Sequence, residues 1–149
     1  MVLFSSFFES PQIKRQKQLV RSATILREQA ARDLWVEVSI LVTYLNAATK
    51  MHQKACLAGN SELAGKFVVT LAKPTELLER LERVRLELEK DIEERKRVAS
   101  SAADFEALAT FELELRDALT QIKKEVKQHL TDLGSLNSQA AQFLSDIAK

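Results

Sequence analysis

The sequence predicts an all-α protein, namely an elongated antiparallel helical bundle or coiled coil with one very long N-terminal helix. Three observations support this prediction. Ala, Leu, Glu, Lys, Arg and Gln dominate the chain, and all of them form helices readily. Only three Gly and two Pro interrupt the 149 residues, which disfavours folds with many short strands and turns. Apolar residues also recur over long stretches at the alternating four- and three-residue spacing of packed helices.

The first helix is expected over residues 11–58, after an apolar segment at residues 1–10. Ser10 and Pro11 form a typical helix start, with an N-cap side chain followed by proline in the first turn. No helix breaker follows before Gly59, so the helix reaches roughly 70 Å at about 1.5 Å per residue. Its apolar seam consists of Leu19, Ala23, Leu26, Ala30, Leu34, Val38, Leu41 and Leu45.

The stretch Leu34–Ala48 is predicted to be the centre of the fold. It contains the only Trp, Trp35, and the only Tyr, Tyr44. Its apolar residues point in nearly every direction around a helix, which is typical of a helix buried among several neighbours. We therefore expect Trp35 to be buried. Alternation within the stretch also fits a strand, but the flanking segments are rich in Ala, Gln, Arg and Lys and favour a helix.

Shorter helices are expected in the rest of a single domain that spans residues 1–149. Gly59 is the predicted C-cap of the first helix, and Ser61 the N-cap of the next. Pro74 should start a new helix, and Gly134 should end one. Ser101 and Asp104 resemble a capping box, although one helix could also run through residues 99–104. The expected elements are a short helix or corner at 61–73 and helices at 74–98, 102–133 and 135–148.

A narrow apolar seam in residues 74–98 is the predicted interaction surface. It is flanked almost entirely by Glu, Arg and Lys, as expected of a coiled-coil face that meets one partner helix. This pattern predicts binding to a protein partner or to another copy of the chain. The seam consists of Leu77, Leu81, Val84 and Leu88.

The N-terminus permits a second interpretation. Residues 1–32 carry six Lys or Arg side chains against two Glu, whereas residues 100–149 carry five basic and eight acidic residues. Basic residues beside an apolar segment are typical of contact with an anionic membrane surface. Alternatively, the apolar segment folds onto the bundle and its rings fill the core. The possible lipid-contact residues are Phe4, Phe7, Phe8, Lys14, Arg15, Lys17 and Arg21.

No pattern points to catalysis, a cofactor or a metal. His52 and Cys56 lie one helical turn apart, but a structural zinc site needs four ligands, and the only other His is His129. The acidic groups Glu112, Glu114, Asp117 and Glu87, Glu89, Asp91 are interpreted as solvated faces. Packing is therefore the expected role of His52 and Cys56, and we expect no enzyme activity.

Composition also limits location and partners. A single Cys, Cys56, rules out an internal disulfide and fits a reducing compartment. No apolar run reaches the roughly 18 residues of a membrane span, and residues 1–8 lack the basic leader of a secretory signal. The long helices are not strongly basic, which disfavours nucleic acid as a partner. The expected protein is a cytoplasmic scaffold, adaptor or assembly subunit, with membrane-surface association as the alternative.

Overall fold

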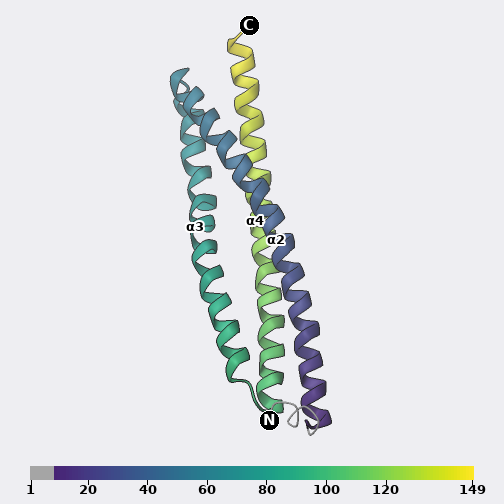
Figure 1. Cartoon of the computed structure of the whole chain (residues 1–149). Coiled ribbons are helices and arrows are strands. Elements are labelled where there is room, and N and C mark those ends of the chain that lie inside the picture. Colours follow the sequence, from purple (N-terminus) through teal and green to yellow (C-terminus); the bar gives the residue numbers. More distant parts are fainter. Residues whose placement is uncertain (1–8) are drawn as a thin grey trace. The chain divides into compact units, whose positions relative to one another are not determined.

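The computed structural model describes residues 9–149, and three long helices account for nearly all of them (Figure 1). Helix α2 spans Pro11–Leu57, α3 spans Ser61–Val98 and α4 spans Ala102–Ile147. No strand occurs among these residues. The prediction of an all-α helical bundle with a long first helix is confirmed. The predicted apolar segment, with Phe4, Phe7 and Phe8, lies largely outside the described residues.

Local capping fixes both ends of α2. The Ser10 hydroxyl accepts a hydrogen bond from the Ile13 amide at 3.1 Å, so Ser10 is the N-cap, as predicted. At the other end, the Gly59 amide donates to the Cys56 carbonyl and the Asn60 amide to the Ala55 carbonyl. These two bonds form a Schellman motif. Gly59 has a φ of 77°, a left-handed conformation that only glycine adopts without strain.

The start of α3 corrects one predicted cap. The Asn60 side-chain oxygen, not the Ser61 hydroxyl, accepts a hydrogen bond from the Leu63 amide at 3.1 Å. Asn60 therefore serves both helices, because its backbone amide closes α2 while its side chain caps α3. Ser61 is the first residue of α3.

The prediction that Pro74 starts a new helix was wrong. Pro74 lies inside α3, so the expected elements 61–73 and 74–98 form one helix. A proline here removes the amide that would bond to the Thr70 carbonyl, at a cost of about 3 kcal/mol. Burial of Phe67, Pro74 and Leu77 on one face offsets this cost and holds the helix together.

The prediction that Gly134 ends a helix was also wrong. Helix α4 continues through Gly134, which merges the expected elements 102–133 and 135–148. The adjacent Leu133 and Leu136 are buried, and a Cβ on Gly134 would lie 3.5 Å from the Tyr44 ring. The Asn137 side-chain amide, through Nδ2, also donates to the Tyr44 backbone carbonyl at 3.4 Å. Packing across these residues outweighs the roughly 1 kcal/mol cost of a helical glycine.

The turn between α3 and α4 lies where the sequence predicted it. Helix α3 ends at Val98 and α4 begins at Ala102, so the alternative of one helix through residues 99–104 was wrong. The Ser101 hydroxyl accepts a bond from the Asp104 amide at 3.1 Å. In return, the Asp104 carboxylate accepts bonds from the Ser100 and Ser101 amides at 3.1 and 3.2 Å. Together these bonds form the predicted capping box.

This capping box makes helix stability depend on pH. Hydrogen bonds from the Ser100 amide, then from the Ser101 amide and hydroxyl, lower the pKa of Asp104 below its usual value. The carboxylate therefore contributes stability above its unfolded-state pKa, and this contribution is lost as pH falls through the folded-state pKa. We expect Asp104→Asn to be less stable than wild type at neutral pH, with the difference shrinking in acid. An NMR titration in which the Asp104 carboxyl shows an ordinary pKa contradicts this.

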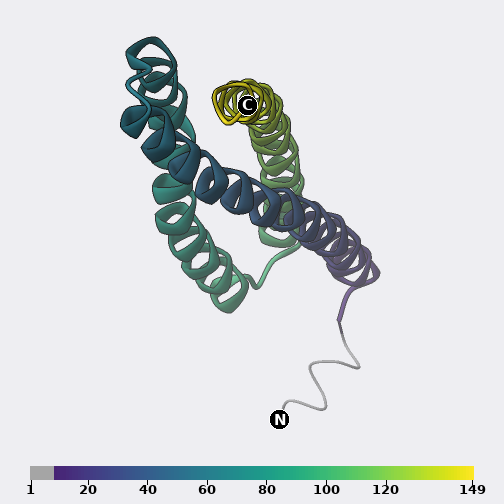
Figure 2. The ribbon, with the colours of Figure 1, turned by 90° about the horizontal axis from the view of Figure 1, so that it is seen from above.

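Packing among the described residues divides the three helices into two compact units. The first unit comprises the described part of Met1–Asp33 together with Arg85–Gln121, and the second comprises Leu34–Val84 and Ile122–Lys149. In the first unit, the first turns of α4 lie between α2 and the last turns of α3 in both ribbon views (Figure 1, Figure 2). The prediction of a single domain over 1–149 stays a prediction.

The stretch Leu34–Ala48 is buried on one face only. Leu34, Leu41 and Ala48 are fully buried, which confirms the predicted seam in the second unit. Trp35 is only half-buried, so its predicted burial was wrong. Further large apolar side chains of this stretch are exposed. They are Val36, Ile40, Val42 and Tyr44.

Candidate functional site

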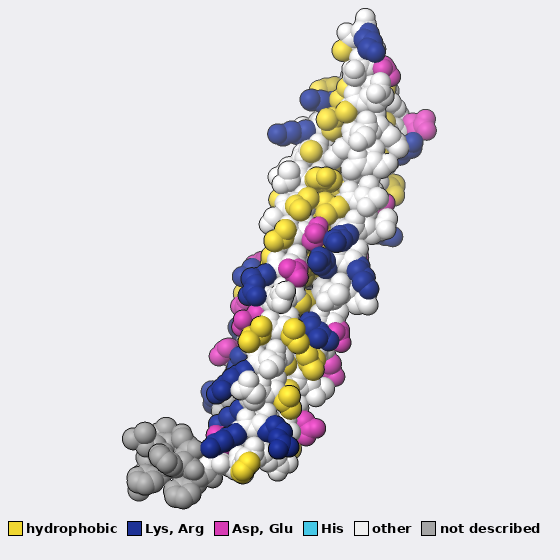
Figure 3. All heavy atoms as spheres, turned by 90° about the vertical axis from the view of Figure 1, so that its right-hand side faces the viewer, with side chains coloured by type: hydrophobic (Ala, Val, Ile, Leu, Met, Phe, Trp, Pro, Cys, Tyr) yellow, Lys and Arg dark blue, Asp and Glu magenta, His cyan; other side chains and the backbone are white. Residues whose placement is uncertain are grey.

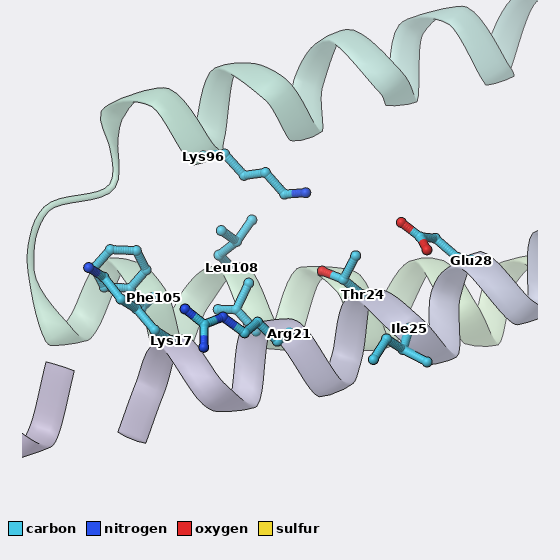
Figure 4. Close-up of a pocket in the computed structure, with 9 residues that line it drawn as sticks. Lys17, Arg21, Thr24, Ile25, Glu28, Lys96, Phe105 and Leu108 are labelled. Atoms are coloured by element: carbon cyan, nitrogen blue, oxygen red, sulfur yellow. The ribbon is translucent and has the colours of Figure 1, made fainter. Parts of the chain in front are cut away.

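An open groove in the first unit is a candidate binding site (Figure 4). Helix α2 forms one wall, α3 contributes only Lys96 to the opposite wall, and Val20 of α2 forms the floor together with α4. The volume of the groove is about 530 Å³. This volume lies within the roughly 300–1,000 Å³ of ligand sites. We call it the α2–α3 groove. Its lining consists of Lys17, Val20, Arg21, Thr24, Ile25, Glu28, Lys96, Phe105 and Leu108.

The floor of the α2–α3 groove belongs to the core of the first unit. Val20 and Ala23 of α2 pack with Leu108 and Ala109 of α4, and Phe105 and Leu113 lie against this cluster. The two alanines have small side chains, which lets the helix backbones approach closely. The seam predicted on this part of α2 was partly wrong, because Leu19 and Leu26 are exposed.

Beside this cluster, Arg27 and Thr24 of α2 hold the carboxylate of Glu112, which is fully buried on α4. The Arg27 Nε lies 2.5 Å from Glu112 Oε2, and the Thr24 hydroxyl donates to Oε1 at 3.2 Å. The prediction that Glu112 belongs to a solvated acidic face was therefore wrong. The burial of Glu112 could have been predicted from the helical spacing, because Glu112 occupies the inward-facing position between Leu108 and Leu115.

Three cations line the α2–α3 groove. Lys17 forms an ion pair with Glu9, and its ammonium lies 5.3 Å from the centre of the Phe105 ring. Arg21 and Lys96 form no ion pair with any residue of the described range 9–149. In Figure 4, Lys96 of α3 and Glu28 of α2 point into the space between the two helices.

The second unit carries an exposed apolar surface on α2. Its members follow the helical spacing i, i+4, i+7 and i+11 and therefore share one face. Val36 is 60% exposed and Ile40 is 40% exposed. The Thr43 hydroxyl donates to the Ser39 carbonyl at 3.2 Å, which satisfies it within the helix. We call this surface the apolar stripe, and it consists of Val36, Ile40, Thr43 and Ala47.

The predicted interaction seam on α3 faces inward. Leu77 and Leu81 are buried, while Val84 and Leu88 are half-buried. Helices of the same chain therefore already cover most of the seam. That this seam binds a partner helix stays a prediction.

The predicted lipid-contact residues are only partly brought together. Lys14, Arg15 and Arg21 are exposed on α2, and Figure 3 shows Lys and Arg side chains near the start of this helix. Lys17 instead pairs with Glu9. Phe4, Phe7 and Phe8 lie outside the described residues. None of the helices within residues 9–149 has a stretch long and apolar enough to cross a membrane.

The residues weighed as metal ligands take part in packing or face solvent. The His52 ring is half-buried, and its centre lies 6.0 Å from that of Phe67, while Cys56 is exposed. His129 is half-buried, with Nε2 4.0 Å from Glu125. Within the range that the structure describes, no three His, Cys, Asp or Glu side chains are grouped to hold a metal ion.

Comparison with known proteins found no family model, no curated protein and no solved structure that matches the chain.

Proposed function

We propose that this protein is a non-enzymatic interaction module, a scaffold or assembly subunit that binds protein helices through surfaces its own helices leave uncovered. The observation that carries this proposal is the apolar stripe. Burying an aliphatic side chain contributes about 1.5–3 kcal/mol relative to leaving it exposed, so Val36 and Ile40 together favour a covering partner. The cytoplasm remains the proposed location, because the single Cys56 fits a reducing compartment.

The occupant that we propose for the apolar stripe is α2 of a second copy. The four side chains of the stripe carry no charge, and Glu37 is the one charged residue between Val36 and Ala47. A neutral apolar surface is complementary to itself, as a two-fold symmetric contact requires. The small side chains of Ser39 and Ala47 permit close approach of two helices, and the Ser39 hydroxyl already donates to the Trp35 carbonyl.

Ile40→Glu is expected to abolish this self-association. A glutamate at the centre of the stripe would be buried without a partner in each copy. We expect dimerisation to weaken by at least about 2 kcal/mol, roughly thirtyfold in the dissociation constant. Light scattering over a concentration series measures the effect. Val69→Glu is the matched control, because Val69 is 75% exposed in the same unit but lies on α3. Wild-type protein that stays monomeric at high micromolar concentration contradicts the proposal.

Association with an anionic membrane surface is the second candidate function. The exposed cations Lys14, Arg15 and Arg21 favour it, because each basic residue near an anionic surface contributes about 1 kcal/mol. Flotation with phosphatidylserine vesicles tests this candidate. Binding that disappears when Met1–Phe8 is deleted supports it, and full-length protein that remains with the unbound fraction excludes it.

A further inference from the structure

We infer that the α2–α3 groove is a docking site for an amphipathic helix of another protein, one whose apolar face is flanked by Asp and Glu side chains. This site goes beyond the proposed self-association, because it uses different residues and lies in the other unit. The two proposals therefore succeed or fail independently.

The apolar part of the groove fits the hydrophobic face of a helix. Val20 and Leu108 are buried in its floor, and Phe105 is half-buried beside them. Ile25 lines the α2 side but is 59% exposed, so the chain's own helices leave much of its surface to water. An amphipathic helix that lies in a groove covers such side chains with its residues at i, i+3, i+4 and i+7.

The positive charges on the two walls favour a docked helix that has acidic residues on both sides of its apolar face. Arg21 belongs to α2 and Lys96 to α3, so they stand on opposite walls (Figure 4). Neither has an acidic partner in the described range 9–149, whereas Lys17 is paired with Glu9. A helix with acidic residues on both sides of its apolar face would meet one cation on each wall. Such rim charges contribute mainly to partner selection and to the association rate.

The dimensions of the groove favour a helix over a lipid chain. Lys17 and Glu28 mark its length on α2 and lie eleven residues apart, which is about 16 Å, or three helical turns. Pockets for small ligands bury about 70–90% of the ligand surface, whereas this groove is open to solvent. Glu28 would also attract the N-terminal end of a docked helix, because the helix dipole is positive at that end.

Selection from a displayed library of helical peptides tests this inference with the full chain as target. The library fixes leucines on one face and randomises the flanking positions. We expect wild-type protein to enrich peptides with Asp or Glu on both flanks. The double variant Arg21→Glu, Lys96→Glu should instead enrich Lys and Arg, because both walls have changed sign. A folding defect cannot produce such a switch.

Affinities of the selected peptides then measure the effect. By fluorescence anisotropy, an acidic peptide should bind the double variant about tenfold more weakly than wild type, and added salt should weaken wild-type binding. The control variant Arg15→Glu, Lys90→Glu changes two exposed cations of the same unit that do not line the groove, and it should bind like wild type.

Three results would overturn the inference. The first is that wild-type and double-variant protein enrich the same peptides. The second is that neither enriches any peptide. The third is that no peptide binds while the double variant loses binding to phosphatidylserine vesicles, in which case the cations serve a lipid surface.

Discussion

Replacing Arg27 with methionine is expected to lower the free energy of unfolding by about 3–5 kcal/mol. Arg27 holds the Glu112 carboxylate, which is fully buried between α2 and α4 of the first unit. Methionine fills similar space but removes the charged partner and leaves a buried carboxylate with only the Thr24 hydroxyl. Denaturant titration measures the loss as a lower midpoint with an unchanged slope.

Two further variants separate loss of the ion pair from loss of packing. Arg21→Met makes the same substitution six residues earlier on α2, at an exposed arginine without an ion pair in the described chain, and should change stability by less than about 0.5 kcal/mol. The double variant Arg27→Met, Glu112→Leu removes both charges and should recover most of the lost stability. If Arg27→Met alone unfolds at the wild-type midpoint, Glu112 does not depend on Arg27.

The sequence predicted the outer bounds of the three helices to within one residue, but it wrongly predicted two internal breaks, at Pro74 and at Gly134. Gly59 and Gly134 have the same intrinsic preference, yet Gly59 ends α2 and Gly134 continues α4. Pro11 and Pro74 differ in the same way, because Pro11 opens a helix and Pro74 lies within one. The difference comes from residues distant in sequence, such as Tyr44 against Gly134, and a single sequence does not reveal these contacts.

The α2–α3 groove was harder to predict from the sequence than the helices, because it also depends on residues that are distant in sequence. The groove depends on Arg21 and Lys96, which belong to different helices, and local spacing says nothing about their position on opposite walls. The burial of Glu112 could have been predicted from the sequence, because Glu112 fills a gap in the apolar repeat of α4. The exposure of Val36 and Ile40 could not be predicted from the sequence, because it depends on how many helices cover α2.

Phe67 anchors the second unit from α3. It is fully buried, and its ring lies 6.0 Å from that of His52 on α2, at a tilt of 35°. Leu63 and Leu77 on the same helix are also buried. Because interiors are close-packed, a cavity at this position would not be refilled by its neighbours without strain.

Phe67→Ala is therefore expected to lower the free energy of unfolding by about 3–5 kcal/mol, through lost burial and the remaining cavity. Val69→Ala is the matched control on α3, because Val69 is 75% exposed and its truncation should change stability by less than about 0.5 kcal/mol. Denaturant midpoints, followed by helical circular dichroism and by Trp35 fluorescence, compare the two variants. Equal midpoints for Phe67→Ala and Val69→Ala would show that Phe67 is not part of the core, and the second unit would then need a different packing of α3 against α2.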